Sequence, residues 1–157
     1  MPRTTLIAVL SLDGAWRTGQ ASFAVLRRLL ALAGNGSGPL WTDIPELRRH
    51  RIPGLRWIET DLLATEMRAS RKGGPYLLLG TPETHAACLA DASSAPHLLI
   101  LRQPEIVVGP RRATFAAGFI PPDGRRVRFR LLSGRATADG YLCHYGPVSL
   151  AKKSSPR

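Results

Sequence analysis

The sequence is poor in cysteine, in aromatic residues and in acids, and each scarcity excludes a class of protein. Two cysteines far apart in 157 residues do not make a disulfide framework, which predicts a reducing, cytoplasmic setting. Aromatic residues make up only 6% of the chain, too few to predict readout of nucleic acid by base stacking. No apolar run is long enough to span a bilayer, and the apolar start of the chain lacks the small-residue cleavage site of a signal peptide. We therefore expect a cytoplasmic protein with no membrane contact.

The chain has 11 acidic residues and 22 lysines and arginines, and the excess of basic residues is unevenly distributed. Residues 1–100 carry 11 basic and eight acidic side chains, a balance of +3, whereas residues 101–157 carry 11 basic and three acidic side chains, a balance of +8. A basic final third predicts a polyanionic partner, most simply nucleic acid. Arginines that only keep a surface solvated would give the same balance, so charge alone leaves the choice open.

Apart from its charge, the composition is that of a globular domain, 44% hydrophobic and 21% charged. Strand-like and helix-like patterns alternate through the first two thirds, and period-two patterns follow. We predict a single domain over 1–150, with an α/β part at 1–102, an antiparallel β part at 103–150 and a flexible basic tail at 151–157. The expected strands lie at 6–12, 39–41, 55–58, 76–79, 97–101, 105–108, 113–120, 125–132 and 140–145, the expected helices at 23–33, 44–49, 60–71 and 81–89, and the tightest turn at 122–124.

Residues 4–34 have the layout of a phosphate-binding loop without its catalytic side chains. An apolar run leads into two glycines five positions apart and then into a helical pattern, as in G-x-x-x-x-G-K-[ST]. Gln20 and Ala21 stand where that motif has its phosphate-binding lysine and its Mg²⁺-binding hydroxyl. Backbone N–H groups can bind an anion without a lysine, although an ordinary strand–helix turn explains the same residues. The candidate remnant of a nucleotide loop consists of Gly14, Gly19, Gln20 and Ser22.

The order of segments over residues 5–135 resembles the core of the RecA-like P-loop ATPases. The stretch 38–80 is similar to their succession of strand, helix, strand, helix and Walker B strand, with Gly80 at the place of the Walker B aspartate. The most similar branch is the short, ATPase-deficient one that includes the cell-division inhibitor SulA and the mutagenesis protein ImuA. The resemblance implies a RecA-like, mainly parallel sheet between helices, closed by antiparallel hairpins, with no cofactor and no catalysis.

For function, the resemblance implies a non-catalytic accessory protein of the SOS response and of translesion mutagenesis. The partners it implies are a recombinase filament, an error-prone polymerase or a cell-division protein, with DNA as a further partner. Arginines at alternate positions of a strand stand about 7 Å apart, near the phosphate spacing of one nucleic-acid strand. The candidate nucleic-acid contacts are Arg111, Arg112, Arg125, Arg126, Arg128, Arg130 and Arg135.

Two alternatives remain open. Residues 76–104 resemble part of the ParA and MinD partition ATPases, which implies a pseudo-ATPase or a regulator of cell division or partition. A metal-dependent hydrolase would instead need Asp13, Glu59 and Asp61 to converge on Mg²⁺ at the carboxyl edge of the sheet. Helix capping explains Asp61 more simply, and a turn before a glycine explains Asp13.

Zinc ligands are also present in the sequence, but their spacing is poor. His85 and Cys88 are one helical turn apart and can share a face, whereas the adjacent Cys143 and His144 point to opposite sides of a strand. One tetrahedral ion cannot readily use such a set, so we predict no metal.

Overall fold

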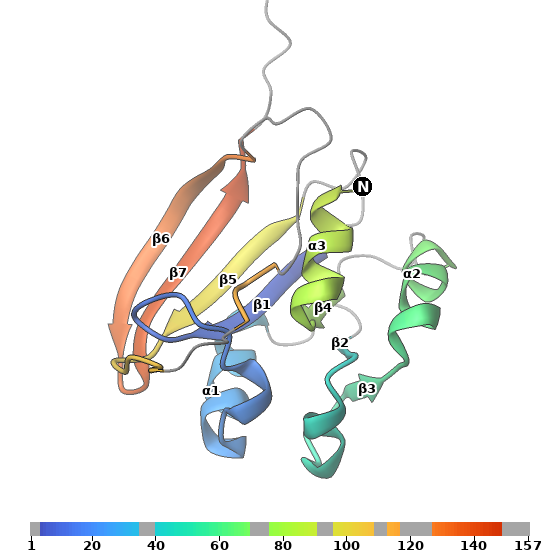
Figure 1. Cartoon of the computed structure of the whole chain (residues 1–157), viewed down its shortest axis with the longest axis horizontal. Helices are drawn as coiled ribbons and strands as arrows, with labels where there is room; N and C mark the ends of the chain where they lie inside the picture. Colours follow the sequence, from blue (N-terminus) through green and yellow to red (C-terminus); the bar gives the residue numbers. More distant parts are fainter. Residues whose placement is uncertain are drawn as a thin grey trace, which may run out of the picture.

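The computed structural model describes residues 4–34, 40–69, 76–90, 96–108, 113–116 and 127–148 (Figure 1). The elements of the first half are β1 (Thr4–Leu10), η1 (Thr18–Gln20), α1 (Phe23–Gly34), β2 (Leu40–Thr42), η2 (Pro45–Arg49), β3 (Leu55–Trp57) and α2 (Thr60–Ala69). Those of the second half are β4 (Tyr76–Leu79), α3 (Pro82–Ala90), β5 (His97–Arg102), β6 (Phe129–Thr137) and β7 (Gly140–Pro147). Within these residues, no helix is both long and apolar enough to cross a membrane.

Seven strands form one sheet in the order β3-β2-β4-β1-β5-β7-β6. The first five of these are parallel, β7 runs antiparallel to β5, and β6 runs antiparallel to β7. The parallel strands come from the part of the sequence in which strand-like and helix-like segments follow one another. The antiparallel pair comes from the part in which apolar residues recur at every second position. The prediction of an α/β fold is therefore confirmed, and the structure places β1 at the centre of a mixed sheet.

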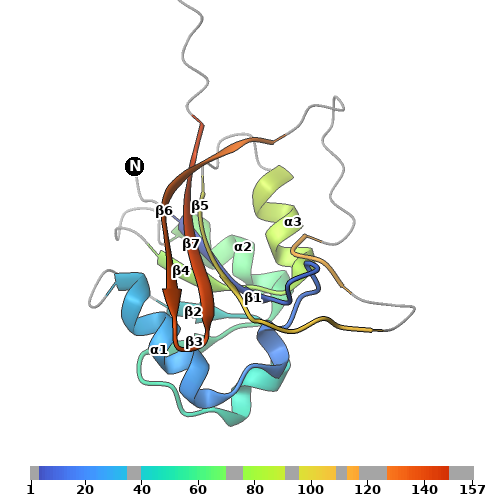
Figure 2. The same cartoon turned by 90° about the vertical axis from the view of Figure 1, so that its left-hand side faces the viewer.

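Two apolar layers hold the parallel strands between helices. On one face Ile7 and Val9 of β1 pack with Leu26 and Leu29 of α1. On the other face Leu6 and Leu78 pack with Leu63 of α2, and α3 lies on the same side (Figure 2). Burial on both faces explains why β1 and β4 are continuous apolar runs rather than alternating ones.

The β6–β7 hairpin turns at Ala138 and Asp139, just before Gly140. Gly140 has a φ of 142°, and a Cβ atom there would lie 2.1 Å from the carbonyl oxygen of Arg102. Only glycine fits this turn against the end of β5. The turn predicted at 122–124 lies outside the described residues, and the prediction of a strand at 105–108 is wrong, since those residues carry no strand pairing.

The loop after β1 differs from a phosphate-binding loop. The chain doubles back so that Trp16 bridges to Leu10 in an antiparallel sense. The backbone N–H groups of the loop donate inside the protein, including Gly14 to Ser11, Trp16 to Ala113 and Arg17 to Val9. A P-loop needs those groups to converge on an anion. The RecA-like interpretation of residues 4–34 therefore fails at the geometry of the backbone.

Candidate functional site at the carboxyl edge of the sheet

The strand order defines a switch point between β1 and β4. The chain leaves β1 toward β2 on one side, and it leaves β4 toward β5 on the other side, so α1 and α3 lie on opposite faces. Ligands of open α/β sheets bind in the crevice outside the carboxyl ends of such strands. The segments that leave the sheet at this edge are residues 11–17 after β1, 43–45 after β2, 80–82 after β4 and 103–108 after β5.

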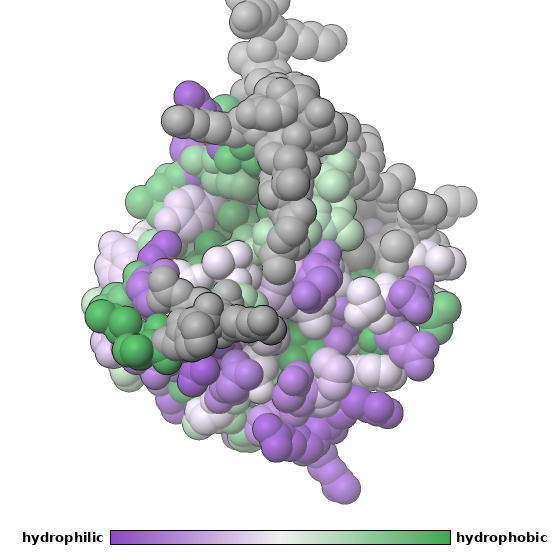
Figure 3. Space-filling model, viewed as in Figure 1, coloured by the Kyte–Doolittle hydropathy of each residue, from purple (hydrophilic) through white to green (hydrophobic). Residues whose placement is uncertain are grey.

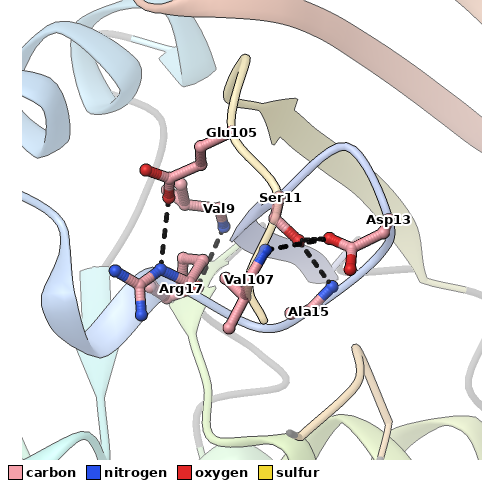
Figure 4. Close-up of polar contacts among 8 residues, drawn as sticks. Val9, Ser11, Asp13, Ala15, Arg17, Glu105 and Val107 are labelled. Atoms are coloured by element: carbon pink, nitrogen blue, oxygen red, sulfur yellow. Dashed lines mark hydrogen bonds and ion pairs between the residues drawn. The ribbon is translucent and has the colours of Figure 1, made fainter. Parts of the chain in front are cut away.

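The β1 side of this edge presents a carboxylate held in place by its neighbours (Figure 4). Ser11 is fully buried, its hydroxyl donates to Oδ1 of Asp13, and its oxygen accepts the N–H of Ala15 at 2.9 Å. The N–H of Val107 also donates to Oδ1 of Asp13, at 3.4 Å. Asp13 itself is exposed, so this contact set fixes a carboxylate at the surface of the crevice.

Charged side chains of the loop after β1, of β5 and of the segment after β5 also occur at this edge. Arg17 pairs with Glu105 at 3.2 Å (Figure 4), and Nη1 of Arg102 donates to the carbonyl oxygen of Leu12 at 3.1 Å. The side chains of the Arg17–Glu105 pair remain 32% and 44% exposed, so both can exchange partners with a ligand. The β1–β5 side thus offers hydrogen-bond donors and acceptors of both charges.

The β4 side is built around the buried carboxylate of Asp43, which is 2% exposed. Its Oδ1 accepts the N–H of Thr81 at 2.9 Å. Its Oδ2 accepts three hydroxyls, from Thr60 at 2.9 Å, from Thr81 at 3.0 Å and from Thr84. One carboxylate therefore joins the ends of β2 and β4 to the first turns of α2 and α3. We call this set the Asp43 node.

His85 lies next to the node and is completely buried. Its Nδ1 lies 2.8 Å from the carbonyl oxygen of Phe115, and its ring stacks on that of Phe115 with centroids 4.4 Å apart. A carbonyl only accepts, so Nδ1 carries the proton and Nε2 presents a lone pair, which has no partner within the described residues. Burial lowers the pKa of His85 to about 4, which keeps the ring neutral.

The ring of His85 explains Gly80. A Cβ atom on Gly80 would lie 2.8 Å from Cδ2 and 2.9 Å from Nε2 of this ring. The space that a glycine leaves at the end of a strand often admits a ligand, but here a side chain of the same protein fills it. We expected Gly80 to replace a catalytic aspartate, but packing against the His85 ring explains the glycine instead.

A dinucleotide phosphate does not fit the N-terminus of α3. Pro82 has no N–H at the first helical position, and the Thr81 N–H already donates to Asp43. The carboxylates of Asp43 and Glu83 repel an anion there, and Nε2 of His85 offers it a lone pair rather than a donor. The β1–β5 side of the crevice is therefore the side that can take a charged or polar ligand.

The three carboxylates of the predicted hydrolase do not converge. Asp13 follows β1, whereas Glu59 and Asp61 lie three strands away, beside β3 and in the first turn of α2. The backbone carbonyl oxygen of Glu59 accepts the N–H groups of Leu62 and Leu63, as at a helix start. No group of three metal-ligating side chains occurs among the described residues, and the hydrolase alternative is not supported.

The zinc-type ligands are likewise separated. His85 is stacked under Phe115, whereas His144 of β7 lies 3.0 Å, Nε2 to Nδ1, from His97 of β5. Neither His85 nor the His97–His144 pair belongs to a group of three metal-ligating side chains among the described residues.

The residues of the predicted nucleotide loop have structural partners. Gly19 is buried against the ring of Trp16, where a Cβ atom would lie 3.0 Å from the indole. The Ser22 hydroxyl accepts the N–H of Val25 at 3.2 Å and so caps α1. Anion binding at Gly14, Gly19, Gln20 and Ser22 stays a prediction.

The predicted arginine surface is only partly described. Arg128, Arg130 and Arg135 are exposed on or beside β6, and Arg111, Arg112, Arg125 and Arg126 lie outside the described residues. Further exposed arginines occur on α1, η2 and β3, where hydrophilic residues gather at the lower edge of the molecule in Figure 3. Basic charge is thus not confined to the final third, and nucleic-acid contact stays a prediction.

No family model matches the sequence, and no curated protein does. Solved structures do match its fold. A pyrimidine reductase-like protein from Corynebacterium diphtheriae matches 94% of this chain and 92% of its own length, with 11% identity and a TM-score of 0.62. RibD of Acinetobacter baumannii matches with 15% identity and a TM-score of 0.63. A diaminohydroxyphosphoribosylaminopyrimidine deaminase/5-amino-6-(5-phosphoribosylamino)uracil reductase from Thermotoga maritima matches with 11% identity and a TM-score of 0.64.

This chain covers only 58% and 57% of the latter two proteins. At these identities the likeness establishes the fold, and that fold is shared with reductases rather than with RecA-like ATPases. The prediction of a RecA-like protein related to SulA and ImuA is therefore wrong. So is the prediction of a non-catalytic accessory protein of DNA damage and translesion synthesis, because the structural neighbours are enzymes of another class.

Sequence reasoning missed the Asp43 node and the His85 packing. Thr60 and Thr81 begin the two helices expected at 60–71 and 81–89, and each stands close to the end of an expected strand. The signal in the sequence was Thr42-Asp43 at the end of an expected strand, followed by two expected helices that begin at Thr60 and Thr81. It does not say that one carboxylate serves both helices.

Proposed function

We propose that this protein is a reductase of a pyrimidine-type heterocycle, with its substrate at the β1–β5 side of the carboxyl edge. The observation that carries the proposal is a fold match over 94% of the chain to each of three proteins whose names include a reductase or RibD. The β1–β5 side of the crevice also supports the proposal, since its exposed polar groups can form hydrogen bonds with ring nitrogens and carbonyl groups.

Asp13 is the residue we assign to proton transfer. Reduction adds a hydride equivalent to an electrophilic carbon and a proton to the heteroatom bound to that carbon. A carboxyl group at the crevice, oriented by Ser11 and by the Val107 N–H, is placed to give or take that proton. Arg17 and Arg102 are placed to bind anionic or carbonyl groups of the same substrate.

A reductase needs an electron donor, and reductases of α/β fold commonly use a nicotinamide dinucleotide. Phosphates of such a donor do not fit the α3 N-terminus, for the reasons of charge and hydrogen bonding given above. We therefore assign no donor site.

The test offers 5-amino-6-(5-phosphoribosylamino)uracil to the purified protein with NADPH, NADH or dithionite-reduced flavin mononucleotide in turn. Mass spectrometry of the pyrimidine detects the gain of two hydrogens. We expect turnover with at least one donor and a loss of about 100-fold in kcat for Asp13→Asn. Asp61→Asn, which neutralises an exposed carboxylate in α2, should keep the activity of the parent. Absence of reduced product with all three donors from folded protein would overturn the proposal.

A further inference from the structure

We propose that the Asp43 carboxylate is a built-in anion, occupying the place at the α3 N-terminus that α/β folds otherwise give to an oxyanion of a ligand. The native protein accordingly takes no phosphate there, and removal of the carboxylate creates a site for small oxyanions such as formate. The proposal concerns ligand exclusion at the crevice, and it stands whether or not the reductase proposal holds.

The donor set around Asp43 is that of an anion site. Three hydroxyls and one backbone N–H point at its two oxygens, from the beginnings of two helices and the end of β4. Helix N-termini carry partial positive charge and favour a negative group. A formate or phosphate oxygen would make the same contacts, but the side chain is already present and is 2% exposed.

His85 supplies an independent sign that this end of the crevice is closed. Its Nε2 is fully buried, points at Gly80 and has no donor within the described residues. The neutral ring cannot provide a proton to a phosphate, since Nδ1–H is held by the Phe115 carbonyl. A ligand oxyanion beside Gly80 would meet a lone pair and a carboxylate, and both disfavour it.

The first arm of the experiment uses the native chain. Inorganic phosphate and ADP are titrated while amide signals of Thr81, Glu83 and Thr84 are followed by ¹⁵N–¹H NMR. We expect these signals to remain in place. Specific, saturable shifts at these three amides would overturn the proposal, because they would show a phosphate at the α3 N-terminus.

The second arm uses Asp43→Ala and measures its melting temperature with and without formate, acetate and phosphate. We expect formate to raise the Tm by about 4 °C at roughly ten times its Kd, and the native chain to show no such rise. Asp61→Ala is the matched control, because it removes an exposed carboxylate from the first turn of α2 without opening a cavity.

Rescue of Asp43→Ala but not of Asp61→Ala supports the built-in anion, and equal responses of the two variants overturn it. If Asp43→Ala does not fold, the native titration decides alone. Both readouts are amide shifts and stability rather than turnover, so failure of this inference and failure of the reductase proposal are separate results.

Discussion

The five parallel strands and the β6–β7 hairpin belong to one sheet, but different interactions specify them. In the parallel part Leu6 and Leu78 are at most 1% exposed, and buried polar groups such as Asp43 have their hydrogen bonds inside the protein. In the hairpin Leu131 and Tyr141 are 54% and 49% exposed. Packing on both faces fixes the first region, whereas the second depends on backbone pairing, a glycine turn and a few side chains that reach the core, such as Leu142. The candidate site lies where the rigid region ends.

The largest difference between the regions should appear in core truncations. Leu78→Ala removes a buried side chain of β4 and leaves a cavity between α2 and the sheet, at a cost of about 3.5 kcal/mol in unfolding free energy. Leu131→Ala, the same change on β6, should cost about 0.5 kcal/mol or less because the side chain is half exposed. Urea denaturation measures both, and equal costs would abolish the distinction.

The pH dependence of stability sharpens the same contrast, because His85 is buried in the parallel part. Its pKa falls from 6.5 to about 4 on folding, so the unfolded chain binds the proton more tightly. The contribution of His85 to the free energy of unfolding should be complete above pH 6.5. It should fall by about 3 kcal/mol in total as the pH drops toward 4.

His85→Gln should remove this part of the slope, and His50→Gln, which alters a half-buried ring of the η2 segment, should leave it unchanged. Asp43 and Glu83 lie near enough to His85 to favour its protonated form. The measurement is therefore the difference between native and variant curves from chemical denaturation at each pH. A native curve parallel to that of His85→Gln would contradict the assignment.

Two glycines offer a matched pair across the regions. Gly80→Ala places a methyl group 2.8 Å from the His85 ring, which Phe115 prevents from moving, so we expect a loss of about 2 kcal/mol. Gly134→Ala in β6 meets the hydroxyl end of Tyr141 at the same 2.8 Å, but that side chain is half exposed and can rotate away. The Tm of the Gly134→Ala variant should therefore change little. A Gly80→Ala/His85→Ala double variant should lose less than the two single losses combined.

The smallest effect should come from the ion pair that ties the hairpin to α1. Arg28 donates to both carboxylate oxygens of Asp139, at 2.5 and 2.7 Å, and this hydrogen bonding lowers the pKa of Asp139. Asp139→Asn should cause a slight drop in Tm that high salt abolishes, since the arginine is exposed. Because the folded pKa of Asp139 is depressed, the contribution is present above pH 3.8 and lost below it. Arg27→Gln, one residue earlier on α1, is the control.

The sequence patterns predicted most elements of the parallel part. Continuous apolar runs bounded by glycine or proline predicted β4 and β5 to within one residue and β1 to within two residues at each end, because burial on both faces leaves little choice of side chain. Strand order was not available from these patterns, since Leu6 and Leu78 would suit several neighbours. The hairpin turns at Ala138 and Asp139, before Gly140, and the prediction did not mark this Asp-Gly signal as a turn.

The site was less predictable than the fold. Glycine spacing at Gly14 and Gly19 suggested an anion-binding loop, but spacing does not determine the direction of backbone N–H groups. Asp13 was correctly placed at the carboxyl edge, yet its proposed metal partners lie three strands away. The sequence presents Asp43 only as a possible cap, with Thr42 as the alternative, of the helix expected at 44–49, because its wider role arises only when four distant segments meet.

The Asp43 node also has a consequence for local opening. Thr60, Thr81 and Thr84 share a single acceptor, so displacement of the Asp43 carboxylate leaves donors at both helix starts without that acceptor. The first turns of α2 and α3, separated by about twenty residues of chain, should therefore exchange their amide hydrogens with deuterium as one cooperative unit. Fluctuations at this end of the crevice would be all-or-none, whereas the β1 side is free to adjust gradually.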